Sequence, residues 1–310
     1  MTIVFFGSPH LAVPFLNTLM IHEGFTVLAV VTQPDRASGR HKIPHPCPVA
    51  QAAAAYKVNL FQPVSLKRDK NIRKKLADLG ADVFVVVAYG SMIPDELLAL
   101  PPFGVINVHP SLLPRHRGPT PMPSAILAGD EVTGISIMKL DHEMDHGPIL
   151  AQLEIPLTSD MDTPALEQIV TYKGPVLLAD TLEAYRKGHL KPREQAHERA
   201  TYCQLLTRDS GRLDWKESAE QLDRTIRAYR PWPGTWTTWK RKRLKILDAA
   251  LAAGSLLKPA GTVYEEGGYV YISCHRGSIL LKQLQLEGGK PLSIRDFLRG
   301  YKDFVGSRVE

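Results

Sequence analysis

An amide and an imidazole stand two positions apart at the end of an apolar segment, in Asn107-Val108-His109. The preceding Val105-Ile106 make this segment a predicted buried strand, in which residues i and i+2 project from the same face. Both polar side chains therefore meet at the end of a strand, where open α/β sheets place their chemistry. Such a pair can donate to one developing oxyanion and move one proton. A carboxylate such as Asp145 can orient the imidazole and raise its basicity. The alternative is that Asn107 and His109 only end the strand and bond to local backbone.

A second pattern, HExxH in His142-Glu143-Met144-Asp145-His146, is typical of zinc proteases. It requires a helix, because only there do the two histidines share a face. Here an alternating strand runs directly into the pattern and Gly147-Pro148 follow at once, which disfavours a helix. We therefore interpret the match as a loop in which Asp145 precedes a tight turn at Gly147.

Nucleotide-binding loops are not indicated by the sequence. The first turn after a strand, Gly7-Ser8-Pro9, is not the GxGxxG fingerprint of dinucleotide sites, and no P-loop occurs.

Composition describes an ordinary globular protein of more than one domain. The chain has 310 residues, 44% of them hydrophobic, and a net charge of +6 that mildly favours an anionic partner. Three scattered cysteines without CxxC spacing indicate a reducing compartment and no cysteine metal site. The start of the chain has no basic region and reads as a strand rather than a signal peptide. No apolar run reaches the ~18 residues of a membrane span, so we expect a cytoplasmic protein without membrane contact.

The first part of the chain alternates apolar strands with helical patterns. The strands are nearly all apolar, as in sheets covered on both faces, and the alternation predicts an α/β fold with a doubly wound, mostly parallel sheet. The predicted strands are 3–6, 27–31, 83–87, 105–109, 135–140 and 149–155, and the helices are 10–22, 48–56, 66–79 and 162–187.

The second part of the chain differs from the first in composition and periodicity. Residues 189–205 are polar and basic without periodicity, which predicts a linker between a domain of residues 1–188 and one of residues 206–310. Short runs separated by Gly-rich turns then predict an all-β, barrel-like module. Its expected strands are 244–247, 261–264, 269–273 and 279–284, with one helix near 217–228.

Two basic segments are candidates for contact with a phosphate backbone. Residues 33–48, too polar and Pro-rich for a regular element, carry Arg36, Arg40 and Lys42 and form either a basic finger or a solvated loop. The densest positive run, 240–245, follows Trp239 and is either a nucleic-acid contact or the solvated tip of a hairpin.

Seven segments together form a recognisable pattern. They are Gln33-Pro34-Asp35-Arg36, Phe61-Gln62-Pro63, Val86-Val87-Ala88-Tyr89-Gly90, Asn107-Val108-His109, Ser111-Leu112-Leu113-Pro114-Arg115, Met144-Asp145-His146-Gly147-Pro148 and Ile226-Arg227-Ala228-Tyr229. In this order they resemble the methionyl-tRNA formyltransferase family, over essentially the whole chain. The Asn…His…Ser-Leu-Leu-Pro…Asp set is shared by formyltetrahydrofolate-using enzymes generally, and the 33–48 loop and the C-terminal module narrow the resemblance to the tRNA enzyme.

The resemblance implies a formyltransferase-type Rossmann-like domain followed by an OB-like barrel that binds tRNA. It implies formyl transfer from 10-formyltetrahydrofolate, as co-substrate, to the α-amine of initiator methionyl-tRNA, by a monomer that needs no metal. Asn107, His109 and Asp145 are then the catalytic residues. The implied folate site is Ser111, Leu112, Leu113, Pro114, Tyr89, Gly90, Met92 and Ile93, and the implied tRNA contacts are Arg36, Arg40, Lys42, Lys240, Arg241, Lys242 and Arg243.

Two alternatives remain open from the sequence. The first is a formyltetrahydrofolate enzyme acting on an amino sugar or on glycinamide ribonucleotide, which needs no basic finger. The second is a non-catalytic tRNA-binding module, which has no use for a buried Asn–His–Asp set that is costly to maintain.

Overall fold

The computed structural model describes residues 1–38, 43–252 and 258–310 and divides them into two compact units. The first unit comprises residues 1–121, 132–156 and 167–204, and the second comprises residues 122–131, 157–166 and 205–310. Among the described residues, no helix combines the length and the apolar character that crossing a membrane requires.

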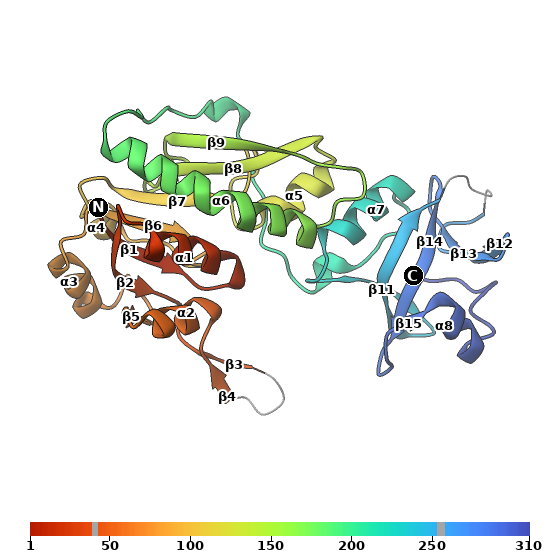
Figure 1. Cartoon of the computed structure of the whole chain (residues 1–310). Coiled ribbons are helices and arrows are strands. Elements are labelled where there is room, and N and C mark those ends of the chain that lie inside the picture. The colour runs from red at the N-terminus through yellow and green to blue at the C-terminus, as the bar shows by residue number, and fades with distance from the viewer. Residues whose placement is uncertain (39–42, 253–257) are drawn as a thin grey trace. The chain divides into compact units, whose positions relative to one another are not determined.

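The first unit is built on a mostly parallel sheet with the strand order β5-β2-β1-β6-β7-β8-β9 (Figure 1). The five strands from β5 to β7 pair in parallel, whereas β8 and β9 are antiparallel to their neighbours. The central strands β6 and β7 are buried at every residue, as their continuous apolar character predicted. The strands are β1 (Thr2–Gly7), β2 (Thr26–Val31), β5 (Asn59–Phe61), β6 (Val83–Val87), β7 (Val105–His109), β8 (Val132–Lys139) and β9 (Ile149–Pro156).

Helices cover both faces of this sheet, so the predicted doubly wound α/β arrangement is confirmed. Helices α1 and α6 lie over one face (Figure 1), and a Cβ added to Gly174 of α6 would meet the Phe15 ring of α1 at 2.5 Å. On the other face, a core cluster joins β1, β2 and β6 to Ile72 and Leu76 of α3 and to Leu97 of α4. The helices of the first unit are α1 (Val13–Ile21, preceded by the 3₁₀ turn His10–Ala12), α2 (Pro48–Tyr56), α3 (Lys70–Asp78), α4 (Asp95–Leu98) and most of α6 (Thr163–Arg186). All but the first residue of α5 (Pro121–Ala128) and the first four residues of α6 belong to the second unit.

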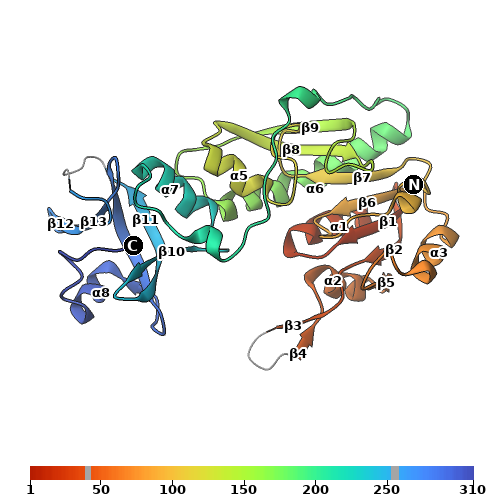
Figure 2. The ribbon, with the colours of Figure 1, turned by 180° about the vertical axis from the view of Figure 1, so that it is seen from behind.

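The basic segment 33–48 contains regular structure, and the prediction that it forms no element was wrong. Strands β3 (Arg36–Ser38) and β4 (Ile43–His45) pair antiparallel as a hairpin that projects from the first unit (Figures 1 and 2). Pro44 is tolerated because an isolated two-stranded pair leaves one side of each strand without a partner for its N–H groups. Arg36 begins β3, whereas Arg40 and Lys42 lie outside the described residues.

The second unit holds an antiparallel sheet, which confirms the all-β expectation for this part of the chain. Its strands follow the order β10-β11-β14-β13-β12, with β15 paired to β14. Within its core, Trp239 and Phe297 each pack edge to face against Phe304. The elements are η3 (Asp209–Gly211), α7 (Ala219–Ala228), β10 (Thr235–Trp239), β11 (Lys242–Leu251), β12 (Val263–Glu266), β13 (Tyr269–Ser273), β14 (Ser278–Leu286), β15 (Leu292–Ser293) and α8 (Ile294–Gly300).

Candidate active site

Three polar side chains meet at the carboxyl end of β7, in the first unit. Asn107 and His109 share one face of the strand, and both are buried, at 9% and 4% exposure. The carboxylate of Asp145 approaches both of them: its Oδ1 lies 3.5 Å from Asn107 Nδ2, and its Oδ2 lies 3.6 Å from His109 Nδ1. The strand geometry and the later loop thus bring together the amide, the imidazole and the carboxylate.

The imidazole of His109 is oriented by a backbone carbonyl. Its Nε2 lies 2.9 Å from the carbonyl oxygen of His116. Because a carbonyl can only accept, Nε2 carries the proton, and in the neutral ring Nδ1 then holds the lone pair. The basic nitrogen therefore faces Asp145, which is placed to stabilise the ring once Nδ1 gains a proton.

The carboxylate of Asp145 is held by a second loop. The Gly118 N–H donates to Asp145 Oδ2 at 2.8 Å, and Asp145 itself adopts a left-handed backbone conformation with φ +49°. Two residues further on, a Cβ at Gly147 would collide with the carbonyl oxygen of Lys139. The glycine is therefore required by the close approach of the two chain segments, and the turn that presents Asp145 is fixed on both sides.

The HExxH segment is a loop of bends and turns between β8 and β9, so the interpretation as a loop is confirmed. Its histidines do not converge. His142 is exposed beside Glu143, whereas His146 bonds to Asp141 at 2.7 Å and stacks on His197 at 4.1 Å between ring centroids.

The residues after β7 form hydrogen bonds and packing contacts within the protein. Ser111 Oγ donates to the carbonyl of Arg115, and its own carbonyl accepts from Ser136. The Leu113 side chain packs with Met138 and Ile149 in a small buried cluster, and Met138 is the residue of β8 that pairs with Asn107. Leu112 and Pro114 are half-buried.

The turn after β6 has both buried and exposed residues. The Tyr89 ring packs edge to face on Phe6, and burial raises the pKa of its hydroxyl to about 12. Ile93 belongs to the same core cluster, whereas Gly90 and Met92 are exposed. The structure therefore presents Gly90 and Met92 at the surface of this turn.

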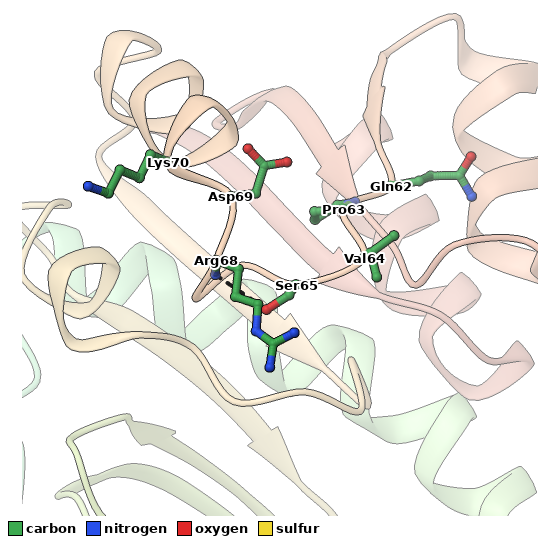
Figure 3. A pocket seen from close by; sticks show the side chains of 7 residues that line it. All are labelled: Gln62, Pro63, Val64, Ser65, Arg68, Asp69 and Lys70. Carbon is green, nitrogen blue, oxygen red and sulfur yellow. Dashed lines mark hydrogen bonds between the residues drawn. The ribbon is translucent and has the colours of Figure 1, made fainter.

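A surface hollow elsewhere in the first unit does not include the trio. It is formed by the loop that precedes α3 and by the start of that helix, where Asp69 caps the Ile72 N–H (Figure 3). Val64 in this loop is 90% exposed. The hollow is lined by Gln62, Pro63, Val64, Ser65, Arg68, Asp69 and Lys70.

The basic run of the second unit forms the turn between β10 and β11. Lys240 and Arg241 both have positive φ, as a two-residue hairpin turn requires. Lys240 pairs with Asp303, and the Arg243 guanidinium lies 4.0 Å from the centre of the Trp236 ring. Arg241 and Lys242 are exposed. The hairpin is confirmed, and Arg241 and Lys242 are exposed cations at its turn.

Residues that the sequence did not single out complete the first unit's site. Gln195, Thr201 and Tyr202, from the segment predicted as a linker, bond to the loops that carry Arg117 and Asp145. In Figure 2 this segment descends past the loops between β7 and α5. A polar stretch without periodicity gives no helix or strand signal, so only the positions of its acceptors and donors in space reveal these contacts.

Comparison with known proteins identifies two matching family models. Residues 1–182 match the model described as formyl transferase, and residues 205–302 match the formyl transferase C-terminal domain. A methionyl-tRNA formyltransferase of Roseiflexus castenholzii is 42% identical over 308 residues, covering 99% of this chain and 98% of the relative. One of Caldanaerobacter subterraneus subsp. tengcongensis is 38% identical and covers 97% of each chain.

Solved structures share the fold at lower identity. WlaRD, a sugar 3N-formyl transferase crystallised in the presence of dTDP and 5-N-formyl-THF, is 16% identical with a TM-score of 0.66, over 94% of this chain and 99% of that one. HypX from Aquifex aeolicus in complex with tetrahydrofolic acid is 15% identical with a TM-score of 0.63, over 98% of this chain and 48% of that one.

Proposed function

The chain belongs to the formyl transferase family, and we propose that it transfers a formyl group from 10-formyltetrahydrofolate to the α-amine of initiator methionyl-tRNA. The observation that carries this proposal is the meeting of Asn107, His109 and Asp145, with the basic nitrogen of the imidazole directed at the carboxylate. The near full-length similarity to methionyl-tRNA formyltransferases supports the choice of acceptor. The enzyme is proposed to act in the cytoplasm as a monomer.

The proposed reaction is an acyl transfer without a covalent enzyme intermediate. The neutral amine of the methionyl group attacks the formyl carbon, and a new C–N bond forms as the carbonyl oxygen becomes an oxyanion. Asn107 donates an amide N–H to this oxyanion. His109 takes the amine proton at Nδ1 and returns it to N10 of the folate as the C–N10 bond breaks. Asp145 stabilises the imidazolium between these two steps.

The folate donor is proposed to bind beside β7 and the turn after β6. The loop after β7 follows His109 directly in the chain, and the turn after β6 follows the adjacent parallel strand, in which Val87 pairs with Val108. The solved relatives that carry folates share this architecture. The residues proposed for this role are Ser111, Leu112, Leu113, Pro114, Tyr89, Gly90, Met92 and Ile93. Where Tyr89 and Ile93 pack in the core, their contribution is to support the backbone of the loop.

The acceptor tRNA is proposed to contact both basic segments. Residues 1–188 would carry the chemistry and residues 206–310 would bind the polyanion, joined through residues 189–205. Arg241 and Lys242 are exposed at the turn between β10 and β11, where cations can reach a phosphate backbone. The proposed contacts are Arg36, Arg40 and Lys42 in the first unit and Lys240, Arg241, Lys242 and Arg243 in the second.

The test is a transfer assay with the purified chain, 10-formyltetrahydrofolate and three acceptors. Initiator methionyl-tRNA is compared with uncharged tRNA and with a dTDP-linked amino sugar, the acceptor class suggested by the structural neighbours. Tetrahydrofolate release is followed by absorbance, and the acceptor is analysed by mass spectrometry after hydrolysis. We expect N-formylmethionine from charged tRNA alone. Formylation of the amino sugar without formylation of the tRNA would overturn the proposal, and so would tRNA binding without transfer.

A further inference from the structure

The buried guanidinium of Arg117 lies in a network of neutral groups next to the candidate active site. Arg117 is 1% exposed and is the largest fully buried side chain among the described residues. Its Nε and Nη2 both donate to Gln195 Oε1, at 3.1 and 2.7 Å, and its Nη1 donates to the Tyr202 hydroxyl at 3.1 Å. Nη2 also bonds to His197 Nδ1 at 2.9 Å. Burying a charge among neutral acceptors costs free energy. We therefore expect Arg117 to have a role beyond packing.

The carboxamide of Gln195 connects this charge to the turn that carries Asp145. Its Nε2 donates to the Asp145 carbonyl at 2.9 Å and to the Gly147 carbonyl at 2.7 Å. Chemistry fixes the orientation of the amide, because arginine can only donate and the two carbonyls can only accept. Arg117 therefore determines which way Gln195 points, and Gln195 holds two carbonyls of the turn.

The same segment of chain also holds the loop on the other side of the site. The Arg117 N–H donates to the Thr201 carbonyl and the Arg117 carbonyl accepts from the Cys203 N–H, each at 2.8 Å. Thr201 Oγ1 accepts from the His116 N–H at 2.8 Å. This loop supplies the carbonyl that orients His109 and the N–H that binds Asp145. Residues 195–203 thus join the two loops that place the groups around the imidazole.

We propose that Arg117 and Gln195 are positioning residues for formyl transfer, acting through the placement of Asp145. Gln195 fixes the left-handed turn so that the carboxylate faces His109 and Asn107, and Arg117 orients Gln195. The inference rests on the proposed function. It assigns no direct contact with substrate to either side chain.

The substitution Gln195→Glu separates positioning from simple accommodation of the buried charge. Glutamate still accepts hydrogen bonds from Arg117 and forms an ion pair with it. It has no N–H group to donate to the Asp145 and Gly147 carbonyls, and its negative charge repels both carbonyl oxygens. A misplacement of about 1 Å costs roughly 10²-fold in rate. We therefore expect kcat to fall about 10- to 100-fold, with the KM for the folate donor within about twofold and an unfolding temperature no lower than that of the wild type. Unchanged or increased kcat would show that Gln195 only stabilises the buried charge of Arg117, and it would overturn the proposal.

A double-mutant cycle with Asp145→Ala tests whether the effect passes through the carboxylate. We expect Gln195→Met to lower kcat about 10- to 100-fold in the wild-type background and less than about threefold when Asp145 is already alanine, because coupled sites are not additive. Equal factors in both backgrounds would indicate a general loss of structure and would refute the positioning role. Glu194→Gln, at an exposed neighbouring position, is the matched control and should retain wild-type kcat. Absence of transfer by the wild-type protein would instead refute the proposed function.

Discussion

Neutralising Asp145 without changing its shape isolates the contribution of its charge. In Asp145→Asn one oxygen remains for the Gly118 N–H, which donates to Oδ2 at 2.8 Å. The new amide nitrogen then faces the Asn107 donor, and the imidazolium of His109 loses the carboxylate 3.6 Å from its Nδ1. At that separation the attraction between unit charges is about 4–5 kcal/mol at an effective dielectric constant of ~20. The amide dipole retains part of this energy, which leaves about 3–4 kcal/mol as the loss in the transition state.

A loss of about 3–4 kcal/mol corresponds to a decrease of roughly 10²- to 10³-fold in kcat. The assay is steady-state formyl transfer to methionyl-tRNA with the donor varied, together with thermal unfolding of the same preparations. The KM for the donor should stay within a few fold, and the unfolding temperature within a few degrees. Glu143→Gln removes the same charge from the exposed part of the same loop and should leave kcat unchanged. If Asp145→Asn kept near wild-type kcat, the role of the carboxylate in stabilising the imidazolium would be wrong.

Four further outcomes are expected. Asn107→Ala removes the proposed oxyanion donor and should lower kcat about 10²- to 10³-fold with donor KM within a few fold; unchanged kcat in the transfer assay would exclude that role. Gly174→Ala places a methyl group against the buried Phe15 ring and should destabilise the fold by about 1–3 kcal/mol in chemical denaturation, whereas Gly300→Ala, with open space around it, should be neutral or stabilising. Burial raises the pKa of the Cys274 thiol to about 12, so fewer than about one in a thousand of these thiols is ionised at pH 8.5. Alkylation at that pH, followed by mass spectrometry, should therefore modify the half-buried Cys47 before Cys274. Rapid labelling of Cys274 in the folded protein would contradict this. Arg241→Ala and Lys242→Ala should each reduce the salt dependence of tRNA binding by about one unit of log–log slope for each phosphate that the variant no longer neutralises, and Lys240→Ala, whose ammonium pairs with Asp303, should reduce it less.

The elements that carry the sheet were predictable because their signal is strong and local. Runs such as Val83–Val87 and Val105–His109 are apolar at nearly every residue, so a strand formed by them must be buried on both faces. The structure places them in adjacent parallel strands. Short elements gave no such signal. Strand β5 has three residues and helix α4 has four, so neither is long enough for its hydrophobic period to repeat. The β3–β4 hairpin was missed because prolines and charges dominate its composition.

The candidate site was predictable to the extent that it lies on one strand. Asn107 and His109 are related by the period of two that every strand imposes. Asp145 was identified through the resemblance and through its place before Gly147, and the structure brings it within reach of both. The partner that orients His109 had no signal in the sequence, because it is the backbone carbonyl of His116 and any residue type supplies one. Backbone contacts of this kind depend only on the path of the chain.

The segment 189–205 shows that a polar segment without periodicity can do more than link two domains. Two of its polar side chains bond to backbone groups of other loops: Gln195 donates to the carbonyls of Asp145 and Gly147, and Thr201 accepts from the His116 N–H. Periodicity detects burial of apolar faces, whereas this segment is held by hydrogen bonds at irregular spacing. The candidate carboxylate of Asp145 lies on a left-handed turn, a conformation that is uncommon for residues other than glycine, and hydrogen bonds from outside the loop hold that turn. The position of Asp145 therefore depends on residues about 50 positions away in the sequence, and substitutions there are expected to change rate before they change stability.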